Sequence, residues 1–309
     1  MKLEGIHHIT AITGDAPANV EFYAGVLGLR LVKKTVNQDD PTVYHLFYAD
    51  EAGSPGADLT FFEYPGARPG RAGTGMVPRV VWRVASTEAI AFWERRLAAH
   101  GVDGERSAGG GLRFADPEGL DHELVVASGP DAPLIADAPD VPREHALQGF
   151  DGVRAYASDP DRSAALLRET LGFAGGEDGS WEVRGDERGG RYVYDAPPEV
   201  SPIPGAGTIH HVAFATRMED HEAWQDRVTR AGARATPIID RFYFRSIYFR
   251  EPSGVLFELA TMGPGFDADE DAAHLGERLS LPPKFEPLRD QLERRLTPLP
   301  DPRAARSSA

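Results

Sequence analysis

The chain of 309 residues contains an internal repeat, which constrains its fold more than any other feature. Residues 114–126 (FADPEGLDHELVV) and 249–261 (FREPSGVLFELAT) share the pattern F-x-[DE]-P-x-G-x-x-x-E-L in register. Proline presets φ and glycine tolerates a positive φ, so the Pro-x-Gly step predicts a turn. The apolar runs on both sides of this turn predict a hairpin. Each copy therefore closes a structural unit that occurs at least twice.

Each copy follows a helix-like stretch, at 87–100 and at 219–231, preceded by the runs VPRVVWRVAS and GTIHHVAFAT. Two looser copies start at LEGIHHITAIT and GFDGVRAYAS and continue into helix-like stretches at 16–25 and 161–171. These two helices end alike, in VLGLR and TLGF, with a glycine where a helix C-cap needs one. The sequence thus predicts four βαβββ modules in a row, an α+β repeat architecture.

A segment rich in proline and aspartate separates the four modules into two pairs. It predicts an N-terminal domain at 1–130, a linker at 131–148 and a C-terminal domain at 149–262, with two modules in each domain. After these modules the repeat pattern stops. Residues 263–309 are expected to form a proline-rich tail with one amphipathic helix at about 284–296.

Composition narrows the classes of function. No apolar run approaches the roughly 18 residues of a membrane helix, and the N-terminal MKLEGIHHIT has no signal-peptide pattern, so we expect a cytoplasmic protein that does not enter a membrane. A net charge of −15 without a Lys/Arg cluster argues against nucleic acid as a partner. The absence of cysteine excludes disulfides and thiolate ligands. Histidine and carboxylate ligands remain, and these suit iron, manganese or zinc.

Two of the four predicted first strands carry a pair of adjacent histidines, His7–His8 and His210–His211. Neighbouring residues of a strand face opposite sides of a sheet, so only one histidine of each pair can point into a cavity. Both faces of the first strand mix polar and apolar residues. Strand parity therefore leaves open which member of each pair points inward.

The last predicted strand supplies a carboxylate, Glu258, inside the apolar run VLFELA. A carboxylate is costly to bury unless it is paired or bound to a metal. Two imidazoles and one carboxylate form the facial triad of non-haem Fe(II) sites, which leaves coordination positions open. Glu63, at the end of the first module, is a rival ligand. Glu123 is the repeat equivalent of Glu258, but its module opens without histidine, so we interpret it as a remnant of duplication.

The remaining histidines have no partner in the repeat pattern, and we predict surface or capping roles for His45, His100, His122, His145, His221 and His274. In the run FYFRSIYF, alternation places Tyr248 on one strand face with Ser246 and Arg250. Core packing with a satisfied hydroxyl group is as good an interpretation of this tyrosine as a role in a site.

The HHIT start, the IHHVAF strand and the GVLFELAT end resemble the vicinal oxygen chelate superfamily. Within it, the runs VKKTVNQDDPTVYHLFYADEAGSPG, DRFYFRSIYFREPSG and PGFDADED resemble the hydroquinone-type ring-cleaving dioxygenases. The resemblance covers nearly the whole chain. It implies two glyoxalase-like domains with open, curved mixed β-sheets.

The resemblance also implies a ligand set, in which the second histidine of each pair binds the metal. His8, His211 and Glu258 would hold Fe(II), or alternatively Mn(II), between the first and fourth modules. His7 and His210 would orient these ligands through hydrogen bonds.

Further positions in the resembling enzymes imply Tyr248 and Arg241 as residues of the substrate pocket, with Arg245 as the alternative to Arg241. Tyr248 or a nearby histidine such as His210 would hydrogen-bond the bound oxygen or move a proton. The implied partners are O2 and a small aromatic substrate with para or ortho hydroxyl groups. The alternatives are a glyoxalase-like isomerase or lyase and a small-molecule-binding resistance protein. A monomer and a homodimer both fit the sequence.

Overall fold

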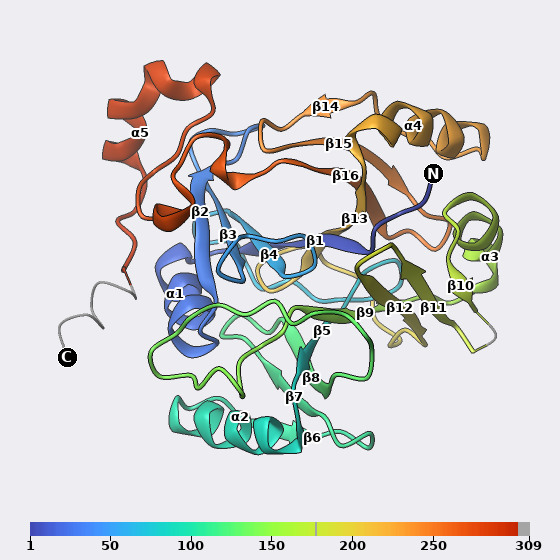
Figure 1. Cartoon of the computed structure of the whole chain (residues 1–309), viewed down its shortest axis with the longest axis horizontal. Helices are drawn as coiled ribbons and strands as arrows, with labels where there is room; N and C mark the ends of the chain where they lie inside the picture. Colours follow the sequence, from blue (N-terminus) through green and yellow to red (C-terminus); the bar gives the residue numbers. More distant parts are fainter. Residues whose placement is uncertain (177, 302–309) are drawn as a thin grey trace.

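The computed structural model describes residues 1–176 and 178–301, in which four modules form two eight-stranded mixed sheets (Figure 1). The predicted α+β class and the four βαβββ modules are confirmed. The first module comprises β1 (Ile6–Thr13), α1 (Ala16–Val20), the π-helical η1 (Glu21–Val26), β2 (Arg30–Val36), β3 (Tyr44–Ala49) and β4 (Asp58–Glu63). The second comprises β5 (Arg79–Val84), α2 (Thr87–Ala99), β6 (Gly104–Arg106), β7 (Leu112–Ala115) and β8 (Asp121–Val126).

The other two modules repeat this order. The third comprises β9 (Phe150–Tyr156), α3 (Asp161–Ala165), the π-helical η2 (Leu166–Thr170), β10 (Ala174–Gly175), β11 (Ser180–Arg184) and β12 (Gly189–Asp195). The fourth comprises β13 (Ile209–Thr216), η3 (Met218–Asp220), α4 (His221–Arg230), β14 (Ile239–Asp240), β15 (Phe244–Arg250) and β16 (Leu256–Pro264). No helix of the described residues is both long and apolar enough to cross a lipid bilayer.

Each sheet combines one module from each half of the chain. The first sheet has the order β14-β15-β16-β13-β1-β4-β3-β2 and joins the fourth module to the first; the second sheet, β10-β11-β12-β9-β5-β8-β7-β6, joins the third to the second. The sheets therefore do not follow the predicted division into 1–130 and 149–262. The physical reason is that the first strand of every module pairs with its own last strand along one edge only. The other edge is free to pair with any other module.

The acidic residue of the repeated motif closes its own turn. The carboxylate of Asp116 accepts the backbone N–H groups two and four residues further on, at 2.9 and 2.8 Å. Glu251 does the same in the second copy, at 2.9 and 3.0 Å. Because the acid binds two N–H groups that the turn would otherwise leave unpaired, the motif encodes the turn through this side chain as well as through Pro and Gly.

The same two carboxylates also bind hydroxyl groups of neighbouring modules. Tyr23 of η1 donates to Asp116 at 2.9 Å and lies 3.0 Å from His122 Nε2, inside the core. Tyr194 of β12 donates to Glu251 at 2.9 Å. The motif therefore also connects the first module to the second and the third to the fourth.

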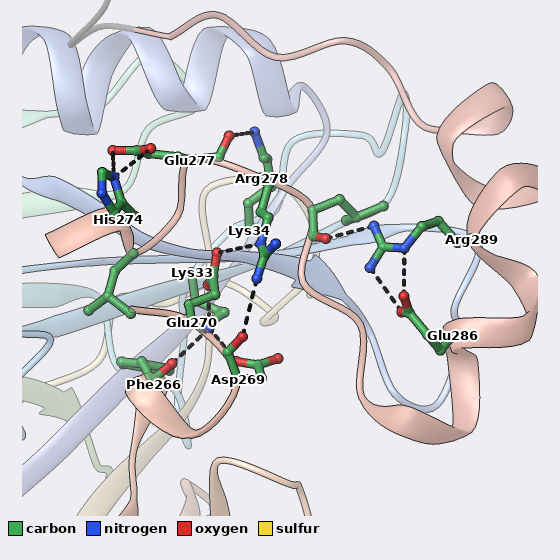
Figure 2. Close-up of polar contacts among 12 residues, drawn as sticks. Lys33, Lys34, Phe266, Asp269, Glu270, His274, Glu277, Arg278, Glu286 and Arg289 are labelled. Atoms are coloured by element: carbon green, nitrogen blue, oxygen red, sulfur yellow. Dashed lines mark hydrogen bonds and ion pairs between the residues drawn. The ribbon is translucent and has the colours of Figure 1, made fainter. Parts of the chain in front are cut away.

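The segment after β16 packs along the edge strand β2 of the first sheet (Figure 2). Its helical turns are η4 (Phe266–Ala268), η5 (Ala272–His274), η6 (Pro283–Leu288) and α5 (Arg289–Arg295). Lys34 of β2 forms an isolated bridge with Leu279, and its carbonyl accepts the N–H of Ser280 at 2.9 Å. The predicted tail helix thus exists as a 3₁₀ turn followed by a short α-helix, and the segment packs against the folded body up to residue 301, where the described residues end.

We expect Tyr23→Phe to lower the free energy of unfolding by about 1–3 kcal/mol, because it leaves the buried carboxylate of Asp116 without this donor and the Nε2–H of His122 without its acceptor. Urea unfolding measures this change. Tyr64→Phe, at an exposed tyrosine, is the matched control and should change stability by less than about 0.5 kcal/mol. Equal stabilities of Tyr23→Phe and the unmodified chain would contradict the proposed link between modules.

Candidate metal centre and its cavity

Three neighbouring strands at the middle of the first sheet bring His8, His211 and Glu258 together. The two Nε2 atoms of the histidines lie 3.2 Å apart. Glu258 Oε2 lies 2.8 Å from Nε2 of His211 and 3.2 Å from Nε2 of His8. Residues separated by 250 positions in the chain thus point three ligand-type atoms at one spot, within 4.8 Å of one another.

The chemistry of this cluster fits a divalent metal ion. Glu258 is fully buried, and neither of its carboxylate oxygens has a hydrogen-bond partner of good geometry among the described residues. Burial alone would raise the pKa of Glu258, but the nearby imidazoles of His8 and His211 hold it well below its usual range. A buried ionised carboxylate must be paired with positive charge, and a metal ion bound by the same three side chains would supply that charge. Two nitrogens and one oxygen suit first-row divalent metals.

The first histidine of each pair contacts the second through its ring nitrogen. His7 Nδ1 lies 2.9 Å from His8 Nδ1, and His210 Nδ1 lies 2.8 Å from His211 Nδ1. Burial lowers the pKa of His7 to about 3 and that of His210 to about 4, so both are neutral at pH 7. His7 Nε2 is 3.2 Å from the carbonyl of Thr261. If His7 Nε2–H donates to this carbonyl, His7 Nδ1 carries no proton and accepts a hydrogen bond from His8 Nδ1–H. His8 Nε2 then carries no proton and is free to bind a cation.

The prediction that the two histidines of each pair face opposite sides of the sheet therefore holds only in part. His8 and His211 point at Glu258, as a strand face requires, but the two rings of each pair form a T-shaped contact with ring centroids 5.0 and 5.1 Å apart. A register shift between Ile6 and Ile9 distorts β1 at the first pair. Alternation alone could not reveal this contact.

Strand register explains why Glu258, and not Glu63, belongs to the cluster. In the sheet, Ala213 pairs with Glu258 and lies two residues after His211. In the first module, Thr10 pairs with Thr60 and lies two residues after His8. Thr60 is thus the counterpart of Glu258 in the first module and provides no carboxylate. Glu63 lies three residues further along β4, outside the cluster. Three protein ligands therefore stand where a symmetric site would have four.

The second sheet has a different arrangement at the equivalent place. Register places Arg79 where the first sheet has His211, and its guanidinium lies 3.4 Å from Glu123. Arg113 approaches the same carboxylate at 3.5 Å. Glu123 is therefore neutralised by arginines, which agrees with its interpretation as a remnant of duplication.

A cavity opens beside His8 and His211. Its walls are largely aromatic and include Phe47, Phe62, Phe244 and Tyr248. The ring of Tyr248 lies 5.6 Å from that of His211 and faces it edge-on. Burial raises the pKa of Tyr248, so its hydroxyl group stays protonated at neutral pH. The cavity suits a flat apolar molecule that presents polar groups toward the histidines.

Arg241 lines this cavity, whereas Arg245 is exposed outside it. The guanidinium of Arg241 lies 5.7 Å from the ring of Tyr248. It forms a bidentate ion pair with Asp39 at 2.9 and 3.0 Å, and Gln38 donates to its backbone carbonyl. Of the two arginines considered from the sequence, the structure thus brings Arg241 to the candidate centre.

His45 is a residue of the site that sequence reasoning missed. It lines the cavity, and its Nε2 lies 3.0 Å from the hydroxyl of Thr60. Burial, with His8 and His211 nearby, lowers its pKa well below the usual range. The predicted surface or capping role was therefore wrong. The alternation of YHLFYA, which puts His45 and Phe47 on one face, is the signal that could have revealed it.

The same prediction is wrong for His122 and His221, which are buried. His122 bonds with Tyr23 and Trp82, and His221 with Thr216. It is confirmed for two others: His100 caps α2 and His274 is exposed. His145 is half-buried and stacks on Phe92.

Comparison with known proteins identifies the family. Residues 5–124 and 149–259 match the model of the Glyoxalase/Bleomycin resistance protein/Dioxygenase superfamily, and the chain belongs to this superfamily. Two curated relatives come from Bacillus subtilis: the "Putative ring-cleaving dioxygenase MhqO", 43% identical over 96% of this chain and 97% of the relative, and the similarly named MhqA, 38% identical over 97% and 100%. The chlorohydroquinone/hydroquinone 1,2-dioxygenase of Sphingobium indicum is 32% identical, over 95% and 96%.

Solved structures agree with this assignment. A crystal structure titled "putative dioxygenase" from Bacillus subtilis superposes with a TM-score of 0.90 at 40% identity, over 97% of this chain and 98% of the other. Glyoxalase I from Zea mays, at 14% identity and a TM-score of 0.56 over 89% and 96%, shares the fold.

Asp58, which pairs with His8 in the sheet register, is a further buried acid. It is 1% exposed, and neither oxygen has a hydrogen-bond partner among the described residues. Burial, and then the charge of Asp50, raises its pKa well above the usual range. Because the folded state holds this proton more tightly than the unfolded state does, Asp58 makes the free energy of unfolding fall as pH rises above about 4.

Asp58→Asn removes the ionisable group, so the free energy of unfolding of this variant should not fall as Asp58 ionises. The difference in free energy of unfolding between the variant and the unmodified chain should therefore grow from pH 4 upward and level off above the pKa of Asp58 in the folded state. Denaturant unfolding measured from pH 4 to 8 tests this. Asp226→Asn, at an exposed aspartate, is the control and should show no such growth. A constant difference between Asp58→Asn and the unmodified chain at all pH values would refute the assignment.

Proposed function

We propose that this protein is a non-haem Fe(II)-dependent dioxygenase that cleaves the ring of a hydroquinone- or catechol-type aromatic compound. The names of the relatives support ring cleavage by dioxygen and, for the Sphingobium enzyme, a hydroquinone substrate. The observation that carries the proposal is the convergence of His8, His211 and Glu258 beside an aromatic cavity.

His8, His211 and Glu258 would hold the metal, with Mn(II) as the alternative ion for the same ligand set. Bound Fe(II) supplies the redox chemistry that lets dioxygen react with an aromatic ring. Because Thr60 stands where a second carboxylate would complete a set of four ligands, part of the coordination sphere would stay free for substrate. His7 and His210 fix the ring orientation of the two ligand histidines through the Nδ1 contacts.

The cavity residues would bind and orient the aromatic ring. Phe62 and Phe244 exclude water and pack against the ring faces. The guanidinium of Arg241 favours the ionised form of a substrate hydroxyl group. Tyr248 keeps its proton and can donate it in a hydrogen bond to an oxygen atom of the substrate or of dioxygen. Tyr248 and Arg241 are thus the cavity groups that we assign to catalysis, and His210 acts on the reaction through its contact with His211.

Measurement of bound iron distinguishes the proposed ligands from the equivalent acid of the second sheet. The purified chain, reconstituted anaerobically with Fe(II) and desalted, should retain about one iron per chain by elemental analysis. Glu258→Ala and His211→Ala should retain almost none, because two ligands hold the ion weakly. Glu123→Ala, which removes the equivalent acid of the second sheet, should retain as much iron as the unmodified chain. Full iron retention by Glu258→Ala would reject the centre.

Oxygen uptake tests the reaction. An oxygen electrode should record uptake with hydroquinones or catechols by the Fe(II)-loaded protein, with ring-opened product by mass spectrometry. Arg241→Ala should raise KM at least about tenfold, since it removes a charged hydrogen-bond donor from the cavity. Arg245→Ala, at the exposed arginine of the same hairpin, should leave KM unchanged. Isomerisation or ligand binding without oxygen uptake would instead favour a glyoxalase-like enzyme or a binding protein.

A further inference from the structure

One wall of the cavity is a turn with a strained backbone. Phe242, between β14 and β15, has φ = +70°, and among the described residues it is the only one other than glycine with a positive φ. A residue with a Cβ atom is disfavoured in this region, so it persists there only where its surroundings hold it. Within the turn, Asp240 accepts the N–H of Phe242 at 2.8 Å.

The residues on both sides of Phe242 reach the candidate centre. Arg241, before it, points into the cavity toward Tyr248. Phe244, after it, packs against His8 with ring centroids 5.1 Å apart. A change of conformation at Phe242 would therefore displace a charged and an aromatic wall of the cavity together.

Tyr243 connects this turn to the C-terminal segment. Its hydroxyl group donates to Asp269 Oδ2 at 3.0 Å, and its backbone carbonyl accepts the N–H of Gly265 at 2.9 Å. Tyr243 is 2% exposed and also lines the cavity, so one side chain contacts both the tail and the space for a ligand.

A buried lysine anchors the other side of Asp269. Lys33 of β2 is completely buried, and its ammonium group donates to Asp269 Oδ1 at 2.8 Å, to the carbonyl of Phe266 at 2.9 Å and to Glu270 (Figure 2). Its Nζ lies 4.7 Å from the centroid of the Tyr243 ring. A buried ammonium group with all three donors engaged gives Asp269 a single well-defined place. The tail thereby becomes a rigid support for the turn.

We propose that Tyr243 is a positioning residue: through Asp269 and Lys33 it ties the strained turn to the C-terminal segment and so holds Arg241 and Phe244 where a hydroxylated aromatic ring binds. This inference rests on the proposed function for the identity of the ligand. The hydroxyl of Tyr243 acts on the turn and has no part in the chemistry.

Tyr243→Phe removes this one hydroxyl group and keeps the ring. The turn would then spend part of its time in conformations that do not bind substrate. The apparent affinity for substrate falls in proportion to the fraction of molecules that have the binding conformation. We expect KM for hydroquinone, and its dissociation constant under anaerobic conditions, to rise about five- to tenfold, because one hydrogen bond that holds the turn is lost. kcat should stay within about twofold, because bound substrate selects the competent turn. Iron content should not change.

Tyr44→Phe is the matched control. Tyr44 is another buried tyrosine of the first sheet, and its hydroxyl group donates to the tail at the carbonyl of Thr297, 3.0 Å away. It lines no part of the cavity. This variant should leave KM unchanged, so a general weakening of tail packing can be told apart from the specific effect at the turn.

Hydrogen exchange of the unliganded protein gives a readout that does not depend on substrate. Exchange at 239–245 should rise in Tyr243→Phe and stay unchanged in Tyr44→Phe. Unchanged exchange in Tyr243→Phe would overturn the positioning role, and so would raised exchange with unaltered hydroquinone affinity. If the unmodified protein fails to bind hydroquinone or consume oxygen, the proposed function fails, and exchange at 239–245 still decides whether Tyr243 holds the turn.

Discussion

The antiparallel pairing of β1 with β13 is the interaction on which the rest of this structure depends. It joins strands that are separated by about two hundred residues and places Thr10 opposite His211. Without it, His8 would lie in one module and the pair His211–Glu258 in another, and no three-ligand cluster would exist. The same pairing aligns the first and fourth modules so that the cavity forms between their side chains. The candidate centre is thus a property of an interface between modules.

The two halves of the first sheet contribute unequally to this interface. The fourth module supplies a histidine, the carboxylate, and Tyr248 and Arg241 of the cavity wall. The first module supplies the other histidine, but has Thr60 at the place of the second carboxylate. A duplicated scaffold has therefore become asymmetric at the residues that matter for chemistry. An asymmetric ligand set would leave part of a metal ion's coordination sphere free, and His45 and Phe62 line the cavity together with the two histidines of the set.

Much of the fold could be predicted from the sequence because its information is local. Proline, glycine and the acidic residue of the repeated motif encode the turn by themselves, so the four modules could be counted from residues 114–126 and 249–261. The pairing of modules could not be predicted from these patterns, because a free strand edge carries no information about its partner. Only the resemblance to known enzymes pointed to the first and fourth modules.

The site divides in the same way. Glu258 was recognised because a carboxylate in an apolar run needs a partner, and the paired histidines marked their own strands. Which histidine of each pair faces inward depends on strand parity and on a local irregularity in β1, which sequence alone does not reveal. His45 was missed because its partner, the hydroxyl of Thr60, lies on another strand and has no distinctive spacing. The support of the turn by Lys33 was also out of reach, since a lysine in a strand usually indicates a solvated edge.

The nested arrangement of modules, with the second and third inside the first and fourth, has a consequence for how the protein is made. During synthesis from the N-terminus, the second sheet can assemble once β12 has left the ribosome, whereas the open edge of β1 is covered only after β13, in the last third of the chain, has been made. Until then the edge of β1 has unpaired N–H and C=O groups that can pair with strands of other chains. The pairing of β1 with β13 is also slow, because the two strands are far apart in the sequence. The nascent chain therefore passes through a stage in which chaperone protection of β1 would matter most.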